Sequence, residues 1–204
     1  MFIALSLLIA VGVCEAQVVV DRATTIGEIK PMNGVNNGPL SPTIKGNVQG
    51  RNNTEVYAAA IQVCQNSPID ILMYYDASPN HEFTGIFDHP TLQPTKTYYS
   101  LYAWRRLAEY GTQVKATSSD KDIYVTAARN ANGKMRVMVT RYNDDNNVVT
   151  PKRVKIAVGE NLSGETVAHI TDSARCYTEI PLVVRNGEVE VAMEPNSVVV
   201  IDFE

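Results

Sequence analysis

The sequence is poor in the residues that most often build metal sites. Its 204 residues contain three histidines, and His81, His89 and His169 are scattered along the chain. The three cysteines show no paired spacing either, whereas zinc and haem sites place their ligands at short, regular intervals. We therefore expect no structural metal and no cofactor.

Cysteine pairing is also not favoured. Cys14 lies in the apolar N-terminal stretch, which leaves Cys64 and Cys176. The two could pair in an oxidising compartment, but Cys64 follows a helical pattern and Cys176 lies among short strands. We expect two separate thiols, each at least partly buried.

Basic runs and long apolar runs are missing as well. The net charge is −4 and no stretch concentrates Lys or Arg, so we expect neither nucleic acid nor an anionic membrane surface as a partner. Residues 2–13 are apolar but too short to span a bilayer. No feature predicts a protein partner.

The N-terminal stretch predicts export. It ends in Cys14, Glu15 and Ala16, which indicates a signal peptide over residues 1–16, although it lacks the usual Lys or Arg. The protein is then secreted or periplasmic. Residues 11–14 partly resemble a lipoprotein box, but Val13 suits the position before a lipidated cysteine poorly, so anchoring at Cys14 is the less favoured alternative.

Residues 69–73 form an apolar run followed by Tyr74, Tyr75 and Asp76. Such a run is typical of a parallel strand buried on both faces. In parallel α/β folds, ligands are handled at the carboxyl ends of strands. The exit of this strand is therefore a candidate site, although an ordinary polar loop would give the same pattern.

The preceding and following segments predict two helices and one N-terminal strand. Residues 17–22 are β-branched, residues 26–39 are rich in turn formers, and residues 40–53 show no periodicity. Helical patterns follow over 55–65 and 95–110, with Pro94 near the start of the second and Gly111 as a left-handed stop.

From residue 112 the pattern changes to short strands separated by turns. Asn186 and Gly187 between two alternating runs predict a type I′ hairpin, and residues 130–133 predict another turn. We expect seven strands, over residues 122–128, 134–142, 152–158, 165–171, 180–185, 188–193 and 197–203. They predict an antiparallel β-sandwich, completed by the N-terminal strand over residues 17–28.

Several segments resemble β-xylosidase-type glycoside hydrolases, in or near family 39. The resemblance lies in residues 29–39, 70–76 and 85–88, in the helix over 98–110 and in the strand-rich tail. It implies a (β/α)₈ barrel that carries catalysis and a small β-sandwich built from both chain ends. Residues 30–35 would be barrel strand 1, 55–65 helix 7, 69–74 strand 8 and 95–110 helix 8.

The middle of that barrel has no counterpart. A complete barrel takes roughly 250 residues, so strands 2 to 7 do not fit between residues 35 and 55. The fold class is then α+β: a barrel remnant over residues 29–111 and the β-sandwich over 112–204. A join introduced during sequence assembly across residues 40–53 would give the same gap.

The resemblance also implies that the catalytic residues are missing. Retaining glycosidases need two carboxylates about 5 Å apart, which the family carries on strands 4 and 7, the acid in an Asn-Glu motif. This chain has no Asn-Glu dipeptide. We expect no catalytic residue, and we interpret Asp76, Glu82 and Asp88 as solvated loop acids.

One wall of a sugar site could remain. Strands 1 and 8 are neighbours in a closed barrel, so residues 69–74 should pair in parallel with residues 30–35. Amides and carboxylates suit sugar hydroxyls and aromatic faces stack on pyranose rings, although Asn-Asn-Gly is also common in turns. The predicted substrate-binding residues are Asn33, Asn36, Asn37, Tyr75 and Asp76.

The helix over 95–110 is rich in aromatic residues, which we interpret as packing. The leading hypothesis is a secreted, truncated glycoside hydrolase relative, xylosidase- or arabinosidase-like towards plant-type saccharides, with little or no activity alone. The alternative is a non-catalytic carbohydrate-binding or assembly module, with contacts near Tyr75 and Trp104. Carbohydrate is the expected partner in both.

Overall fold

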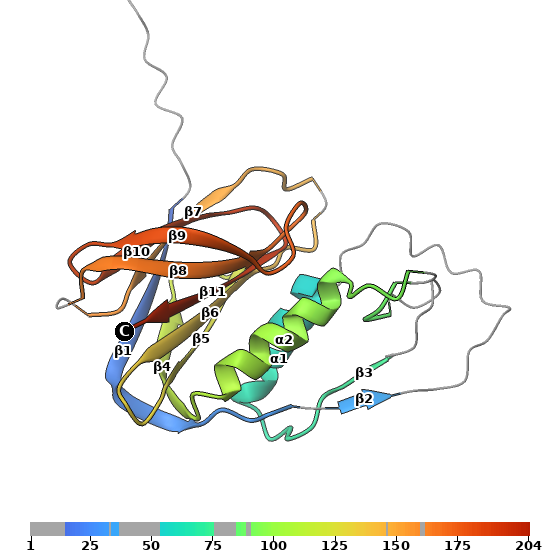
Figure 1. The fold of residues 1–204 in the computed structure, drawn as a ribbon, viewed down its shortest axis with the longest axis horizontal. Coiled ribbons are helices and arrows are strands. Elements are labelled where there is room, and N and C mark those ends of the chain that lie inside the picture. The colour runs from blue at the N-terminus through green and yellow to red at the C-terminus, as the bar shows by residue number, and fades with distance from the viewer. Residues whose placement is uncertain are drawn as a thin grey trace, which may run out of the picture.

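A single large sheet with two helices on one side dominates the molecule (Figure 1). The computed structural model describes residues 15–32, 34–36, 54–75, 85–88, 91–145, 147–159 and 162–204. The large sheet contains β1 (Glu15–Glu28), β4 (Thr112–Ser118), β5 (Ile123–Arg129), β6 (Met135–Arg141), β7 (Lys152–Ala157), β8 (Gly164–Thr171), β9 (Thr178–Val184), β10 (Glu188–Met193) and β11 (Ser197–Phe203). The remaining elements are α1 (Thr54–Gln65), α2 (Lys96–Ala108) and a small sheet of β2 (Gly34–Asn36) and β3 (Met73–Tyr75).

The large sheet is rolled like a barrel. Its strand order is β10-β7-β1-β4-β5-β6-β11-β8-β9, and its two edge strands, β9 and β10, follow each other in the chain. Asn186 and Gly187, with φ of 51° and 74°, form the tight turn between them, beside a bridge from Arg185 to Glu188. This confirms the hairpin that the sequence predicts. The turn brings the last strand of the sheet back towards the first.

The interior of the roll is filled by alternating apolar residues. Strand β10 shows the pattern most clearly, because Val189, Val191 and Met193 are buried while the residues between them are exposed. Strand β7 alternates in the same way through Val154 and Ile156. This period of two is the reason that these segments form strands with one face on the core.

The continuous sheet differs from the two packed sheets expected of a β-sandwich. As predicted, the N-terminal strand joins the C-terminal strands, but β1 is long enough to pair antiparallel with β4 and parallel with β7. Its register shifts between Asp21 and Thr25, where Asp21 accepts hydrogen bonds from Ala23 and Thr24. Such an irregularity bends a strand, so β1 links the two halves into one sheet. Strand β4, which contributes to this link, was not predicted.

Both helices pack on the outer face of the roll. Helix α1 contacts α2 and also β5, β6 and β11, and a second apolar core forms there around Ile61, Trp104 and Leu107. Helix α2 stops where the sequence predicts, because Gly111 has a φ of 78°. The carbonyl of Gly111 accepts a hydrogen bond from Ile29 at 2.7 Å, which ties the end of β1 to the end of α2.

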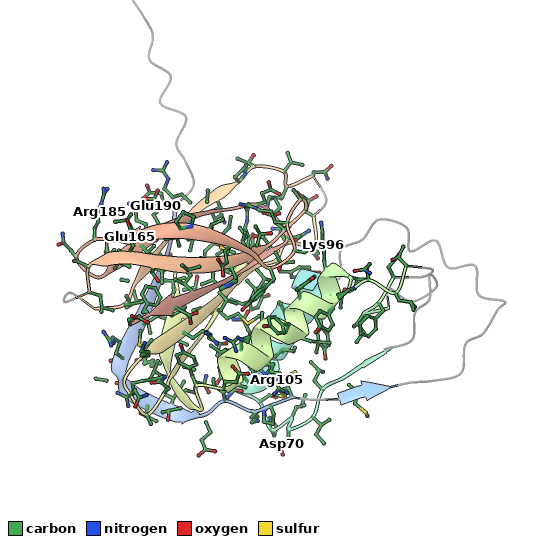
Figure 2. All side chains as sticks on the ribbon, in the orientation of Figure 1. Asp70, Lys96, Arg105, Glu165, Arg185 and Glu190 are labelled. Carbon is green, nitrogen blue, oxygen red and sulfur yellow. The ribbon has the colours of Figure 1, made fainter. Side chains whose placement is uncertain are left out.

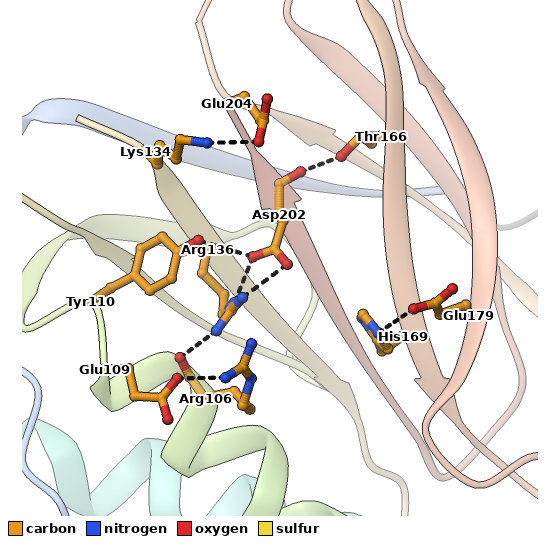
Figure 3. Close-up of polar contacts among 10 residues, drawn as sticks. All are labelled: Arg106, Glu109, Tyr110, Lys134, Arg136, Thr166, His169, Glu179, Asp202 and Glu204. Carbon is orange, nitrogen blue, oxygen red and sulfur yellow. Dashed lines mark hydrogen bonds and ion pairs between the residues drawn. The ribbon is translucent and has the colours of Figure 1, made fainter. Parts of the chain in front are cut away.

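A buried arginine fastens α2 to the sheet (Figure 3). The guanidinium of Arg136 on β6 lies 2.5 Å and 2.9 Å from the carboxylate oxygens of Asp202 on β11 and donates to the carbonyl of Arg106 at 2.6 Å. It also lies 4.5 Å from the centre of the Tyr110 ring. Burial, followed by the nearby Asp202 carboxylate, raises the pKa of Tyr110. This arrangement satisfies a charge that would otherwise be costly to bury.

The two described cysteines, Cys64 and Cys176, are free, as expected, but they differ in exposure. Cys64 is half-buried on α1, whereas Cys176 is exposed. The expectation of burial is wrong for Cys176, because it lies in the loop between β8 and β9 outside the roll. No helix among the described residues is long and apolar enough to cross a membrane.

Candidate functional site

The small sheet starts from a segment that both helices hold in place. The side chain of Gln65, at the end of α1, accepts a hydrogen bond from the backbone amide of Lys30 at 2.9 Å and donates to the carbonyl of Glu28 at 2.8 Å. Its amide also donates to the side chain of Gln113 at 2.7 Å. From α2, the indole of Trp104 donates to the carbonyl of Lys30 at 2.9 Å. These contacts position the chain just before β2.

The side chain of Lys30 positions the segment before β3. Its ammonium donates to the carbonyls of Ser67 and Ile69 at 2.6 Å and 3.0 Å, and it lies 3.5 Å from the carboxylate of Asp70. The approaches to β2 and β3 are therefore joined before the strands begin. Neither Gln65 nor Lys30 was predicted to form these contacts. The available signal was a glutamine on the buried face of a helix.

Strands β2 and β3 pair in parallel, as predicted. Gly34 lies opposite Met73, Val35 opposite Tyr74, and Asn36 opposite Tyr75. The pairing occupies the carboxyl ends of the two predicted segments, and residues 69–72 precede the strand as loop rather than belonging to it. The reason is visible in the preceding contacts, since Lys30 holds Ser67 and Ile69 by their carbonyls.

The pairing brings two of the five predicted site residues together. The backbones of Asn36 and Tyr75 are direct neighbours at the carboxyl end of the parallel pair. Asn33, Asn37 and Asp76 lie outside the described residues. A role for these five residues in sugar binding stays a prediction.

Of the three loop acids, Asp88 is described. It is half-buried in a turn, where its carboxylate accepts a hydrogen bond from the hydroxyl of Thr91 at 2.6 Å. Its backbone carbonyl accepts from Leu92 at 2.8 Å. The turn explains this side chain locally, and Asp76 and Glu82 lie outside the described residues. Within the described ranges, no group of three or more His, Cys, Asp or Glu could hold a metal ion.

Trp104 is not available as a sugar contact. It is 2% exposed and its indole nitrogen is engaged with Lys30. The interpretation of this helix as packing is therefore confirmed at Trp104, and the alternative that placed a ligand near it is wrong at this residue. The reason is that α1 covers this face of α2.

One face of the segment before β3 is exposed. Ile69, Ile71 and Met73 are 43%, 65% and 65% exposed, whereas Leu72 between them packs against the second core. The expectation of burial on both faces is wrong for these three residues, because among the described elements β3 pairs with β2 alone and Leu72 is the residue of this segment that packs against the second core. An apolar stripe of alternating residues is left on the surface.

The backbone is similar to those of solved glycoside hydrolases. A family 30 subfamily 8 xylanase from Clostridium acetobutylicum superposes with a TM-score of 0.60 at 16% identity, covering 73% of this chain and 38% of that chain. The catalytic domain of family 30 xylanase C from Talaromyces cellulolyticus gives 0.57 at 15% identity, with 85% and 39% covered. A family 51 arabinofuranosidase from Xanthomonas axonopodis pv. citri gives 0.53 at 12% identity, with 74% and 35% covered. The chain therefore shares the fold of part of these glycoside hydrolases.

The similarity to these enzymes is in structure rather than in sequence, and it covers only part of each enzyme. No protein-family model and no curated protein matches the sequence. The chain spans about two fifths of the length of the first two enzymes. At these identities the comparison establishes the fold, and activity is a separate question.

Proposed function

We propose that this chain is an internally shortened relative of a glycoside hydrolase that contacts plant-type saccharides but has little or no hydrolytic activity alone. The observation that supports this most is the parallel pairing that sets Asn36 beside Tyr75, within a fold shared with xylanases and an arabinofuranosidase. On this proposal β2 and β3 are the first and last strands of a former (β/α)₈ barrel, α1 and α2 are its last two helices, and the rolled sheet is its accessory sandwich-like domain. Kinship with family 39 and a xylosidase- or arabinosidase-like preference belong to this proposal.

The proposed loss of activity follows from chemistry. Retaining hydrolysis needs a nucleophile and an acid about 5 Å apart across the scissile bond, and the Asn-Glu dipeptide expected of the acid is absent from the sequence. Glu194, in the sequence Met-Glu-Pro, lies just before β11 and accepts a hydrogen bond from Ser173. It belongs to the rolled sheet rather than to the end of the small parallel pair.

A turnover assay tests the hydrolytic part. The purified 204-residue chain is incubated with aryl β-xylosides and aryl arabinofuranosides, and product release is compared with that of an Asp88→Asn variant. We expect no release above the buffer blank. Turnover that the wild-type chain shows and the variant lacks would contradict the proposal.

A binding assay separates an inert remnant from a carbohydrate-binding module. Calorimetric titration with xylo-oligosaccharides suits this purpose better than tryptophan fluorescence, because Trp104 is buried. We expect saturable binding that Asn36→Ala and Tyr75→Ala weaken and Tyr124→Ala, on the rolled sheet, leaves unchanged. Absence of binding would contradict the proposed saccharide contact and leave an inert remnant.

Export is part of the same proposal. Ala16, the last residue of the predicted signal peptide, is buried in β1 opposite Val154. Cleavage after it would shorten β1 by two residues but keep the pairing of Val18 with Ile156. Mass spectrometry of the protein recovered from culture medium or periplasm should then show Gln17 as the first residue, and a lipidated Cys14 would contradict this.

A further inference from the structure

A group of six rings joins α2 to the loop between β8 and β9, and we call it the aromatic seam. Tyr177 lies at its centre, with its ring centre 4.4 Å from that of His169 and 4.9 Å from that of Tyr102. Tyr99 stacks on Tyr177 at 6.3 Å, and Tyr98 stacks on Tyr102 at the same distance. The aromatic seam consists of Phe87, Tyr98, Tyr99, Tyr102, His169 and Tyr177.

The rings of the aromatic seam keep exposed surface. All six side chains are half-buried, in contrast to Trp104 on the same helix, which is enclosed. Packing of α2 on the sheet accounts for the buried part, because burial of aromatic area is strongly stabilising. It does not account for the gathering of so many partly exposed rings in one place.

The four tyrosine hydroxyls of the aromatic seam have no partner among the described residues. Tyr110, on the same stretch of chain, shows the contrast, because its hydroxyl donates to Asp202 at 3.3 Å. None of the four is among the enclosed, unbonded polar atoms of the described residues, but burial raises the pKa of the Tyr177 phenol to about 12. The phenol groups of the three α2 tyrosines, Tyr98, Tyr99 and Tyr102, are therefore the donors and acceptors available on this surface.

The loop holds Tyr177 in an unusual backbone conformation. Its φ is 47°, a left-handed value that is unfavourable for a residue with a side chain. The backbone amide of Tyr177 donates to the hydroxyl of Thr171 at 3.0 Å, and Asp172 accepts from the amides of Ala174 and Arg175. Such strain persists where the surroundings enforce it and often marks functional positions.

The helix side of the aromatic seam is tied to the same loop. The ammonium of Lys96 donates to the carbonyl of Ser173, and Figure 2 shows Lys96 at the end of α2 that faces the rolled sheet. His169 faces Glu179 at 3.4 Å beside the seam (Figure 3). The rings are therefore held by contacts at both sides, which favours a preformed surface over a mobile one.

We propose that the aromatic seam is a second carbohydrate-binding surface, separate from the end of β2 and β3, that takes pyranose rings of a saccharide chain. The half-buried tyrosines of α2, Tyr98, Tyr99 and Tyr102, keep exposed ring surface for the C–H face of a sugar and hydroxyls for its equatorial oxygens. They do so at low cost in side-chain freedom. Tyr177, which stacks on both His169 and Tyr99, holds the rings in place. This inference rests on the carbohydrate binding proposed above, and it names the residues of another contact surface.

The test uses variants that keep the rings and remove the hydroxyls. The full chain and a Tyr99→Phe/Tyr102→Phe double variant are titrated with a xylo-oligosaccharide by calorimetry, with Tyr124→Phe on β5 as the matched control. We expect affinity to fall about tenfold in the double variant, because each lost hydrogen bond to a neutral group weakens binding a few-fold. The control should bind as the wild-type chain does. Equal thermal unfolding of all three proteins shows that folding is not the cause.

The outcomes separate this inference from the proposed function. If Asn36→Ala and Tyr75→Ala weaken binding while the double variant binds normally, the inference that the aromatic seam binds saccharide is overturned, and the proposed function remains. If the double variant weakens binding and the other two do not, the aromatic seam is supported as the contact surface. If the wild-type chain binds no saccharide, both this inference and the saccharide contact of the proposed function are overturned. If Tyr124→Phe loses as much affinity as the double variant, the inference that the aromatic seam binds saccharide is also overturned.

Discussion

The side-chain amide oxygen of Gln65 accepts a hydrogen bond from the backbone amide of Lys30 at 2.9 Å. This contact joins the end of α1 to the chain that enters β2, and the same side chain donates to the carbonyl of Glu28. The parallel pairing of β2 and β3 depends on this junction, because the small sheet is too short to be stable alone.

Replacement of Gln65 should therefore destabilise the molecule. Gln65→Ala leaves backbone groups of Glu28 and Lys30 without partners, which should lower the free energy of unfolding by about 2 to 4 kcal/mol. Urea denaturation measures this, and amide exchange at residues 34–36 should accelerate. Gln93→Ala, at an exposed position, is the control and should change stability by less than about 0.5 kcal/mol. A change as small in Gln65→Ala would show that the junction contributes little.

The Arg136–Asp202 pair should also be sensitive to removal of one partner. The side chain of Arg136 is 6% exposed, so Asp202→Asn leaves a buried guanidinium without its counter-charge. We expect a loss of about 3 to 5 kcal/mol, measured by chemical denaturation. Glu204→Gln removes the exposed partner of Lys134 and serves as the control, with an expected change below about 1 kcal/mol.

Stability should depend on pH through Asp172. Burial pushes its pKa up, but the hydrogen bonds from the Arg175 side chain and from the amides of Ala174 and Arg175 outweigh burial and hold the pKa below 3.8. The folded chain therefore binds this proton more weakly than the unfolded chain, so the stabilisation is present above pH 3.8 and is lost as pH falls through the lowered pKa.

Denaturation at a series of pH values checks this. The difference in unfolding free energy between the wild-type chain and Asp172→Asn should be largest near neutral pH and should shrink below pH 3.8. Asp144→Asn, at an exposed position, should follow the wild-type curve throughout. A difference for Asp172→Asn that does not vary with pH would contradict the linkage.

At alkaline pH the relevant group is Tyr177. Burial raises its pKa from 10.0 to about 12, so the folded chain holds the phenol proton more tightly than the unfolded chain. The contribution is complete below pH 10 and is lost as pH rises towards 12. Tyr177→Phe should lose less stability over this range than the wild-type chain, and ultraviolet titration of the phenolate should show one late-titrating group fewer.

The exposed apolar stripe should promote self-association of the chain. Ile71 and Met73 are each 65% exposed, and neighbouring exposed apolar side chains favour association. An Ile71→Lys/Met73→Lys variant should bind less of an apolar fluorescent dye and should stay soluble at higher concentration, with an unfolding free energy within about 1 kcal/mol of the wild-type value. Val183→Lys, at 52% exposure on β9, is the control, and an equal effect there would show that the stripe is not special.

Local chemistry made several features predictable. Asn186-Gly187 and Gly111 adopt the left-handed conformations that their turn and helix-stop roles require. The seven predicted C-terminal strands are present. Strands β7 and β10 alternate and place one face on the core, whereas β6 and β11 are buried along nearly their whole length because the helices pack on their outer face. The approach of β2 to β3 was predicted differently, from a resemblance that assigned both segments to one barrel.

Long-range contacts decided the rest. Whether β1 joins one sheet or two depends on how far it pairs with β4 and β7, and no local pattern specifies that length. Trp104 and Tyr99 are both aromatic residues of one predicted helix, and the sequence does not distinguish their burial. In the structure, α1 and Lys30 enclose Trp104, whereas the Tyr99 ring stays partly exposed. The pattern of residues 69–73 predicts a strand buried on both faces. One face is nevertheless exposed, because among the described elements β3 pairs with β2 alone and Leu72 is the residue of this segment that packs against the second core.

The amino-acid sequence thus determined where strands, helices and turns form, because these depend on side-chain period and on the backbone preferences of single residues. The tertiary structure decided which residues meet. Asn36 lies beside Tyr75, and Tyr177 beside His169 and Tyr102. Both meetings depend on hydrogen bonds and ring contacts between segments far apart in the chain, such as those of Gln65 with Lys30 and of Lys96 with Ser173.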